Sequence, residues 1–193
     1  MTPESPRKRY SRADLEAARS AQLPDLVCPG LLVLFCGINP GLRSAASGLH
    51  FNRPGNRFWP ALHLSGFTPR LFTPQEQHKL LPLGLGISDI VDRPTAAAQE
   101  LTEEELREGG RHLTAKIERL RPAWVAPLGI TGYRTAFAGP DAVIGPQESR
   151  IGPARVWVLP NPSGRNTHFP LPALTQEFAR LRRACGIPDR RTT

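Results

Sequence analysis

The sequence predicts an α/β protein in which helices cover both faces of a central, mainly parallel sheet, a three-layer α/β/α arrangement. Residues 31–36 and 123–129 are short apolar runs without polar alternation, as expected of parallel strands that are covered on both faces. Segments with helical spacing of apolar residues stand between the runs. This alternation of strands and helices is typical of parallel sheets with right-handed crossovers.

The elements are expected in a simple order. Residues 1–10 are expected to be disordered, and Ser11 is a suitable cap for a short helix that ends near Leu23. Residues 42–57 are rich in Gly, Ser, Asn and Arg and lack periodicity, so we expect a long and therefore functional loop. A second loop, rich in Gly and Pro, is expected before residue 155. Strands are expected over residues 31–36, 83–91, 123–129 and 155–159. Helices are expected over residues 58–65, 74–80, 103–121, 131–138 and 172–184. Two of these helices follow Thr-x-x-Glu capping boxes, at residues 73–76 and 102–105.

No repeat or internal linker divides the 193 residues, so we expect one domain. It covers residues 26–187, between a basic N-terminal tail with a short helix (1–25) and a C-terminal tail (188–193). The net charge of +8 and the pI of about 10.4 favour a polyanionic partner, nucleic acid before membrane. Five basic residues lie in the first nineteen positions, so a solvated basic tail is the alternative explanation of the charge.

The three cysteines, Cys28, Cys36 and Cys185, are scattered and odd in number. Such cysteines favour a reducing compartment over a disulfide framework, and so a cytoplasmic protein. No C-x-x-C pair occurs, so we expect no zinc or iron–sulfur site and no other cofactor. No stretch approaches the roughly 20 apolar residues of a membrane span, and no membrane partner is expected.

Two of the expected strands end in loops that carry an Asn-Pro pair. Residues 37–41 read Gly-Ile-Asn-Pro-Gly, and residues 160–164 read Pro-Asn-Pro-Ser-Gly. The carboxyl ends of parallel strands lie at one edge of the sheet, where ligands bind in open α/β sheets. We therefore expect the two loops to border one cleft, and Asn39 is the first candidate functional residue.

Four segments together resemble a known family: GINPG (37–41), FNRPGNRFW (51–59), VDRPT (91–95) and VLPNPSG (158–164). In order and spacing they are similar to the mismatch-specific uracil/thymine-DNA glycosylases of the uracil-DNA glycosylase superfamily, and most of all to the bacterial mismatch uracil-DNA glycosylases. The resemblance runs from about residue 30 to residue 184. It implies the uracil-DNA glycosylase-like fold and base excision, in which a uracil is flipped from the helix and its N-glycosidic bond is hydrolysed.

The resemblance also implies roles for individual residues. Asn39 stands where the family positions the attacking water, and Phe51 matches the aromatic residue that stacks on the flipped base. Backbone groups near Ile38 and Phe51 would recognise the base edge, and backbone N–H donors of the turn that ends at Gly41 can stabilise the departing base anion. The loop that is pressed into the minor groove corresponds to Asn161, Pro162, Ser163 and Gly164.

Three basic or polar residues beside these motifs are candidates for contacts with DNA. The relatives place an aliphatic wedge directly after NPSG, where this chain has Arg165. Arg165 either fills the gap left by the flipped base and bonds the orphaned partner, or contacts a phosphate. Arg43 and Ser44 follow the first Asn-Pro loop and are candidates for phosphate contacts.

The aspartates near the end of the 83–91 segment are the remaining candidates for catalysis. An ionised Asp89 at the active edge would activate water or stabilise the sugar cation, and its alternative role is to cap a loop. Asp92 belongs to the VDRPT motif and is expected to hold the turn or to pair with Arg93. His50 and His168 flank the expected cleft and are expected to be solvated.

The predicted function is that of a monofunctional DNA glycosylase in base excision repair. Its partner is double-stranded DNA with a G:U or related mismatch, and thymine and damaged pyrimidines are further candidate substrates. The protein is expected to act as a monomer without a cofactor. The alternative is a catalytically silent module of the same fold that binds damaged DNA. The presence of Asn39, Phe51 and both Asn-Pro loops favours the enzyme, and a strand-release assay on a uracil-containing duplex separates the two.

Overall fold

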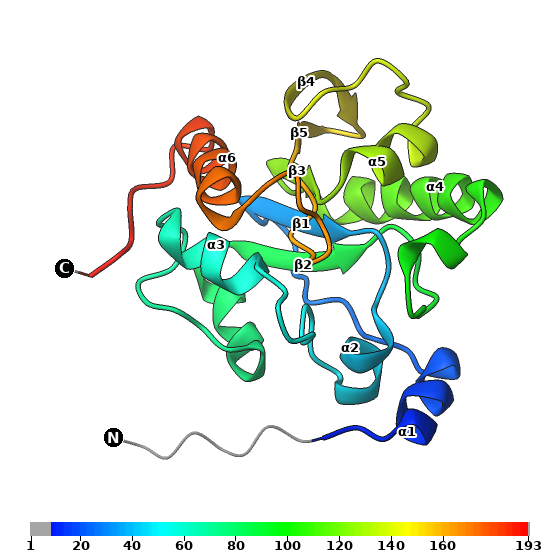
Figure 1. Ribbon diagram of the computed structural model, residues 1–193. Coiled ribbons are helices and arrows are strands. Elements are labelled where there is room, and N and C mark those ends of the chain that lie inside the picture. The colour runs from blue at the N-terminus through cyan, green and yellow to red at the C-terminus, as the bar shows by residue number, and fades with distance from the viewer. Residues whose placement is uncertain (1–8, 193) are drawn as a thin grey trace.

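The computed structural model describes residues 9–192, so the expected disorder of residues 1–10 falls largely outside the described residues. Five strands form one sheet in the order β2-β1-β3-β5-β4, and all neighbours except β5 and β4 are parallel (Figure 1). The predicted α/β class with a central, mainly parallel sheet is confirmed. The strands are β1 (Val33–Gly37), β2 (Leu85–Asp89), β3 (Trp124–Pro127), β4 (Gly145–Ile151) and β5 (Ala154–Val158).

The prediction of a loop before residue 155 is wrong where β4 forms. Gly145 and Pro146, which indicate a turn in the sequence, begin a strand that pairs antiparallel with β5 at the edge of the sheet. The register shifts between Pro146 and Arg150. An edge strand tolerates proline because the missing N–H faces away from the ladder. The segment is a strand because β5 is available to pair with it, and the local sequence does not encode that pairing.

Helices cover both faces of the sheet (Figure 1). Side chains alternate along a strand, so β1 supplies both interiors: Phe35 packs with α3 and α6, and Cys36 packs with α4 and α5. Every residue of β1 is buried, as predicted for a strand in the apolar run 31–36, but Leu32 of that run lies before the strand and is 40% exposed. The helices are α1 (Arg12–Ala17), α2 (Leu42–Ser47), α3 (Phe58–Leu64), α4 (Glu103–Leu120), α5 (Ile130–Ala136) and α6 (Leu171–Ala184), with 3-10 helices η1 (Ala18–Ser20), η2 (Pro74–Leu83) and η3 (Ala98–Glu100).

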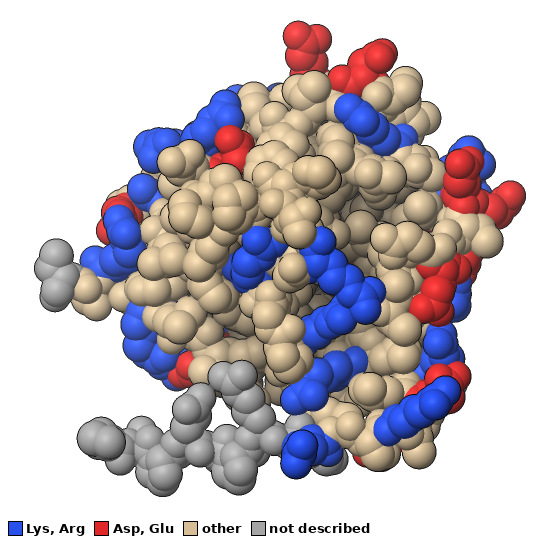
Figure 2. Space-filling view, in the orientation of Figure 1, with Lys and Arg blue, Asp and Glu red and all other residues tan. Residues whose placement is uncertain are grey.

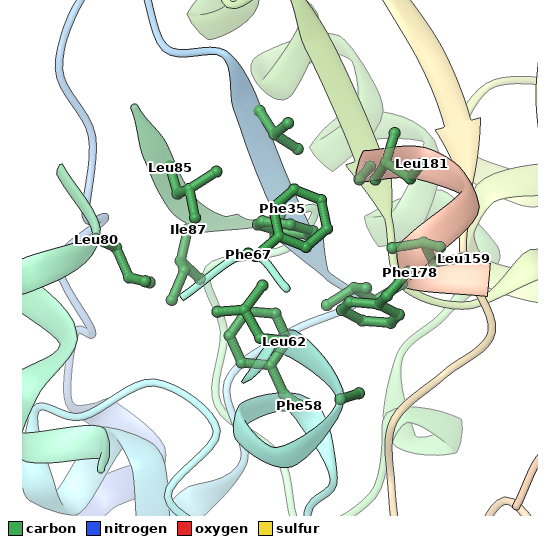
Figure 3. Packing of buried hydrophobic residues seen from close by; sticks show 14 of the residues in the cluster. Phe35, Phe58, Leu62, Phe67, Leu80, Leu85, Ile87, Leu159, Phe178 and Leu181 are labelled. Carbon is green, nitrogen blue, oxygen red and sulfur yellow. The ribbon is translucent and has the colours of Figure 1, made fainter. Parts of the chain in front are cut away.

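Phe35 lies at the centre of the larger core cluster (Figure 3). Its ring centroid is 5.5 Å from those of Phe58 and Phe67, both edge-on, and 5.9 Å from that of Phe178, which is stacked. Phe58 comes from α3 and Phe178 from α6. Aromatic pairs in these arrangements stabilise beyond their buried area. Phe35 therefore joins both helices of this layer to the central strand.

Two helical segments differ in type from the prediction. Residues 42–57 begin with α2, whose six residues are too few to show a helical period in a Gly- and Ser-rich segment. The capping box between Thr73 and Glu76 is formed, but the helix after it is a 3-10 helix. Pro82 lies inside that helix and has no N–H to donate, which disfavours a regular α-helix.

The segment before β1 packs against the domain. Ser11 and Asp14 form a capping box at the start of α1, which ends sooner than predicted because a 3-10 turn follows it. Leu26 and Ile87 of β2 exchange backbone hydrogen bonds of 2.9 and 2.8 Å. Asp25, at the end of the region assigned to the N-terminal tail, accepts a hydrogen bond from the Ser88 hydroxyl of β2 at 2.7 Å, so the end of that region is also attached to the sheet. No helix within residues 9–192 is long and apolar enough to cross a membrane.

Replacement of Phe35 by alanine should lower the free energy of unfolding by about 3–5 kcal/mol, because the change opens a cavity between three rings. Chemical denaturation measures the change. Leu71→Ala is the matched control, since its side chain is 50% exposed and its loss should change the stability little. A similar loss of stability in the two variants would contradict the central position of Phe35.

Candidate active site

A pocket of about 630 Å³ opens at the carboxyl edge of the sheet, and both Asn-Pro loops border it. Asn39 comes from the loop after β1 and Asn161 from the loop after β5, so the structure brings the two loops to one cleft. Among the candidate residues, the lining includes Ile38, Asn39, Gly41, Ser44, Phe51, Asp89, Asn161, Ser163 and Arg165, whereas Arg43, Asp92 and Gly164 lie outside it.

The loop of residues 37–41 is fixed by the segment that follows β2. The carbonyl oxygens on one side of the loop all accept backbone hydrogen bonds from that segment. The amide N–H groups of Ile38 and Asn39 donate to no atom of the described residues, and both residues line the pocket. The three backbone bonds are Ile90 N to Gly37 O (2.9 Å), Val91 N to Ile38 O (2.9 Å) and Thr95 N to Pro40 O (3.0 Å).

The side-chain amide of Asn39 is held in one orientation. Its Nδ2 donates to the hydroxyl of Thr95 at 2.7 Å and to the carbonyl oxygen of Arg93 at 2.8 Å. The Thr95 hydroxyl in turn donates to the carbonyl oxygen of Ala97 at 2.9 Å, which leaves its lone pairs for Asn39. Because the nitrogen is occupied, the amide oxygen of Asn39 is the group that can accept a hydrogen bond from water or a ligand.

Phe51 lines the pocket with a backbone conformation that non-glycine residues rarely adopt. Its φ is +54°, and its ring stacks on Phe58 with the centroids 4.1 Å apart. The carbonyl of His50 accepts a hydrogen bond from an indole N–H at 3.2 Å, and the amide of Asn52 donates to the Ser44 hydroxyl at 3.2 Å. Strain of this kind costs about 1–3 kcal/mol and persists where neighbouring contacts fix it, as at functional sites.

Asp89 ends β2 in the wall of the pocket, where it is 7% exposed. A Cβ atom on Gly37 would collide with its Oδ1, so the Asp89 side chain occupies the space next to this glycine and would have to move if a side chain were added there. Burial, with the charges of Asp25 and Asp92, raises the pKa of Asp89 to about 8, and the charge of Lys116 opposes the rise. The pocket therefore contains a carboxyl group that is mostly protonated at pH 7.

A polar cluster lies behind Asp89. Lys116 Nζ of α4 is 2.5 Å from Asp25 Oδ2, and the hydroxyl of Ser88 donates to Asp25 Oδ1 at 2.7 Å. Lys116 also donates to the Ser88 oxygen at 3.0 Å. The cluster joins the N-terminal segment and α4 to the end of β2, and so fixes the strand next to the carboxyl group in the pocket.

His50 is buried, so the expectation that it is solvated is wrong; His168 is exposed as expected. His50 Nε2 lies 3.0 Å from the carbonyl oxygen of Pro24, which can only accept, so Nε2 carries the proton. Burial lowers the pKa of His50 and keeps the ring neutral. The lone pair is then on Nδ1, which lies 3.9 Å from Asp89 Oδ2, a separation that one water can bridge.

The VDRPT motif (residues 91–95) holds Asn39 through a backbone carbonyl oxygen and the hydroxyl of its threonine. Asp92 is exposed and lies outside the pocket, so Asp89 is the aspartate that lines it. The expected pairing of Asp92 with Arg93 is wrong, because Arg93 Nε binds Glu105 of α4 at 2.6 Å. That ion pair fixes the segment whose carbonyl oxygen and Thr95 hydroxyl hold Asn39.

The loop after β5 turns tightly at the rim of the pocket. Asn161 Oδ1 accepts the amide of Ser163 at 2.9 Å, and Ser163 Oγ accepts the amide of Arg165 at 3.3 Å. A Cβ atom on Gly164 would meet the carbonyl oxygen of Gly55 at 2.6 Å, so this position needs glycine. Arg165 is exposed and forms no ion pair with the described residues.

Basic side chains gather on the face that carries this loop. Figure 2 shows Lys and Arg around the middle of the face, whereas Asp and Glu lie mostly toward its periphery. Arg53 and Arg165 line the pocket. Arg43 lies over the ring of Tyr10, 5.1 Å from its centroid. A basic surface around a pocket attracts a polyanion. Within the described residues, no group of three His, Cys, Asp or Glu side chains is arranged to hold a metal ion.

A family model described as the uracil DNA glycosylase superfamily matches residues 24–182 of the chain. The chain belongs to the uracil DNA glycosylase superfamily. The match includes both Asn-Pro loops, Phe51 and Asp89, and it confirms the superfamily that the sequence motifs predict. Membership indicates a DNA glycosylase of the uracil type, a hydrolase that acts on DNA.

Three residues that complete the pocket of this glycosylase carry little signal in the sequence. Thr95 is the last residue of VDRPT, and that motif alone indicates its importance. His50 directly precedes Phe51, but nothing in the sequence shows that Pro24 covers it. Leu23 lines the pocket from a segment that reads as a tail.

The raised pKa of Asp89 predicts a pH-dependent stability. The folded carboxyl keeps its proton up to about pH 8, whereas the unfolded one releases it near pH 4, so folding takes up a proton between these values. The stability contributed by this group is complete below pH 4 and is lost as the pH rises to 8. The Tm of the wild type should therefore fall relative to that of Asp89→Asn across this window and level off above it.

Gln147→Ala on the edge strand β4 supplies the control for this measurement, because it removes no ionisable group. The Tm difference between the wild type and Gln147→Ala should stay nearly constant from pH 4 to pH 9. A constant difference for Asp89→Asn as well would show that the Asp89 carboxyl titrates normally.

Proposed function

We propose that this glycosylase is a monofunctional, mismatch-specific uracil-DNA glycosylase that flips uracil mispaired with guanine out of duplex DNA and hydrolyses its N-glycosidic bond. The observation that carries the proposal is the meeting of Asn39, Phe51 and Asp89 in one pocket beside the loop of residues 160–164. Membership in the superfamily supplies the reaction class. The resemblance of the four motifs to the bacterial mismatch glycosylases supports the finer assignment.

The base would be held between aromatic and backbone groups. Phe51 provides a flat apolar surface that its stack on Phe58 keeps in place, and a flipped pyrimidine needs such a surface. The amides of Ile38 and Asn39 can donate to the carbonyl oxygens of the base. As the base leaves with a negative charge, the same donors stabilise it. Gly41 lines the pocket beside them.

Hydrolysis requires a positioned water and a group that takes its proton. The oxygen of the water attacks C1′ of the deoxyribose, the C1′–N1 bond breaks, and its electron pair leaves with the base. Asn39 orients the water through its amide oxygen, since its nitrogen is bound to Thr95 and Arg93. The described lining of the pocket includes no lysine, which supports attack by water over attack by an amine.

Asp89 would accept the proton of that water. A general base works best when its pKa lies near the operating pH, and the pKa of Asp89 is raised to about 8. The ionised carboxylate would also stabilise the positive charge that develops on the sugar. His50 Nδ1 lies near enough to share a water with Asp89 and can only accept a hydrogen bond from it. These contacts support Asp89 as the base.

The rim residues would bind the duplex. Asn161, Ser163 and Gly164 enter the minor groove, and Arg165 directly after them fills the gap left by the flipped base. The exposure of Arg165 and its lack of an ion pair within the described residues support this role. Ser44 is buried and its hydroxyl holds the amide of Asn52, which favours a role in shaping the base pocket over a phosphate contact. Arg43 remains a candidate for a phosphate contact.

Asn39→Ala should lower the single-turnover rate of uracil release from a G:U duplex by about 100-fold or more, because the attacking water loses its positioning group. Duplex affinity, measured by fluorescence anisotropy, should stay near that of the wild type. Gln147→Ala, which removes an amide on the distant strand β4, is the control. A wild-type rate for Asn39→Ala would refute its role. A wild type that binds the duplex but releases no base would instead indicate the silent binding module.

The single-turnover rate of the wild type should rise by about tenfold per pH unit below pH 8 and level off above it, because the ionised form of Asp89 is the active one. Asp89→Asn should lose about 10²–10⁴-fold in rate and the pH dependence together. Rates from pH 5 to pH 10 on a G:U duplex measure both. A rate that falls as the pH rises through 8 would show that Asp89 acts as an acid.

A further inference from the structure

The guanidinium group of Arg57 binds the rim loop through an unusual number of backbone carbonyl groups. Arg57 is half-buried at the start of α3 and does not line the pocket. Its own amide N–H also donates to the loop. The bonds run from Nη1 to Phe169 O (2.6 Å), from Nη2 to Ser163 O (2.6 Å) and Asn166 O (2.8 Å), from Nε to Pro162 O (3.4 Å), and from the backbone N to Pro162 O (3.0 Å).

These bonds add to the side-chain bonds that the loop forms within itself, such as that from the amide of Ser163 to Asn161 Oδ1. Residues 160–169 form no helix and no strand beyond the end of β5, so few backbone bonds within the loop fix it. Arg57 forms no ion pair within residues 9–192, so its charge is directed wholly to the carbonyl oxygens. Hydrogen bonds from a charged donor are stronger than those between neutral groups. A second contact, Gly164 against Gly55, joins the loop to the same segment.

The direction of these bonds suits a surface that meets DNA. Four carbonyl oxygens of the loop are bound to Arg57 and so are not free acceptors on its surface. The groups left to face outward include the exposed side chain of Arg165. A loop whose acceptors are turned inward avoids repulsion with a polyanion and can enter a groove without reorganising.

We infer that Arg57 is the positioning residue of the minor-groove loop: it orders residues 161–169 in advance, so that Arg165 fills the helix gap while the base is out. This inference rests on the proposed function. It gives the FNRPGNRFW motif a task distinct from that of Phe51. Phe51 receives the base, and Arg57, six residues later, prepares the loop that replaces the base in the helix.

The test compares Arg57→Gln with a matched control, Arg190→Gln. Arg190 is also half-buried and also donates to two backbone carbonyls, of Phe67 and Leu83, away from the pocket. Hydrogen exchange of residues 161–169, measured by mass spectrometry, should rise by about tenfold or more in Arg57→Gln and stay at the wild-type level in Arg190→Gln. Unchanged exchange in Arg57→Gln would overturn the inference.

Base flipping is then measured separately from bond cleavage, by combining each Arg57 variant with Asn39→Ala, which should release little base. The wild-type loop should raise the fluorescence of a 2-aminopurine placed beside the G:U mismatch, and Arg57→Gln should lower the fraction flipped by about tenfold. Arg57→Lys retains the charge but not the fork of donors, so it should restore only part of the signal. Equal flipping in Arg57→Gln and Arg190→Gln would overturn the inference.

Two further outcomes keep this inference separate from the proposed function. If the wild type releases no uracil, the proposed function is contradicted. Hydrogen exchange of residues 161–169 in Arg57→Gln still tests whether Arg57 orders the loop. If Arg57→Gln is unfolded by circular dichroism, Arg57→Lys carries the comparison. If Arg57→Lys and Arg57→Gln both match the wild type in hydrogen exchange of the loop and in base flipping, Arg57 supports only the fold.

Discussion

The docking of the first Asn-Pro loop onto the segment after β2 is the interaction on which the site depends. Three backbone bonds join the two segments, and the side chain of Asn39 adds its own bonds to Thr95 and Arg93. Since both segments continue neighbouring parallel strands, the sheet itself sets their separation. The carbonyl groups of the loop accept bonds from the second segment, whereas the amides of Ile38 and Asn39 in the pocket lining have no partner among the described residues. The proposed donors for the base therefore result from ordinary strand geometry.

The same pair of strands explains why a carboxyl group can stay in the wall of a nucleic-acid pocket. Gly37 has no side chain, and the space it leaves is taken by Asp89. A buried carboxylate beside the phosphates of DNA would be unfavourable, but at a pKa of about 8 the group is mostly neutral when DNA arrives. In the proposed mechanism its charge would become favourable only as the sugar becomes positive. Burial thus reconciles an acidic side chain with an anionic substrate.

Features that depend on local sequence were predictable, and features that depend on distant pairing were not. The buried strand β1 and the capping boxes at Thr73 and Thr102 show in their own residues. The edge strand β4 needs β5, and the burial of His50 needs Pro24, so neither shows locally. Parallel strand order places both Asn-Pro loops at one edge, which made the cleft predictable. It does not reveal that the Asp89 side chain, rather than that of Asp92, turns into the pocket.

The carbonyl of Pro24 has a consequence for how the protein can be shortened. Pro24 and Leu23 lie at or before the first residue of the family match, in a stretch that looks dispensable. Yet the Pro24 carbonyl decides which nitrogen of His50 carries the proton. A recombinant version trimmed to begin after residue 25 would retain each motif but release the imidazole to rotate and to change tautomer. The segment that holds the pocket together therefore begins upstream of the boundary that the motifs define.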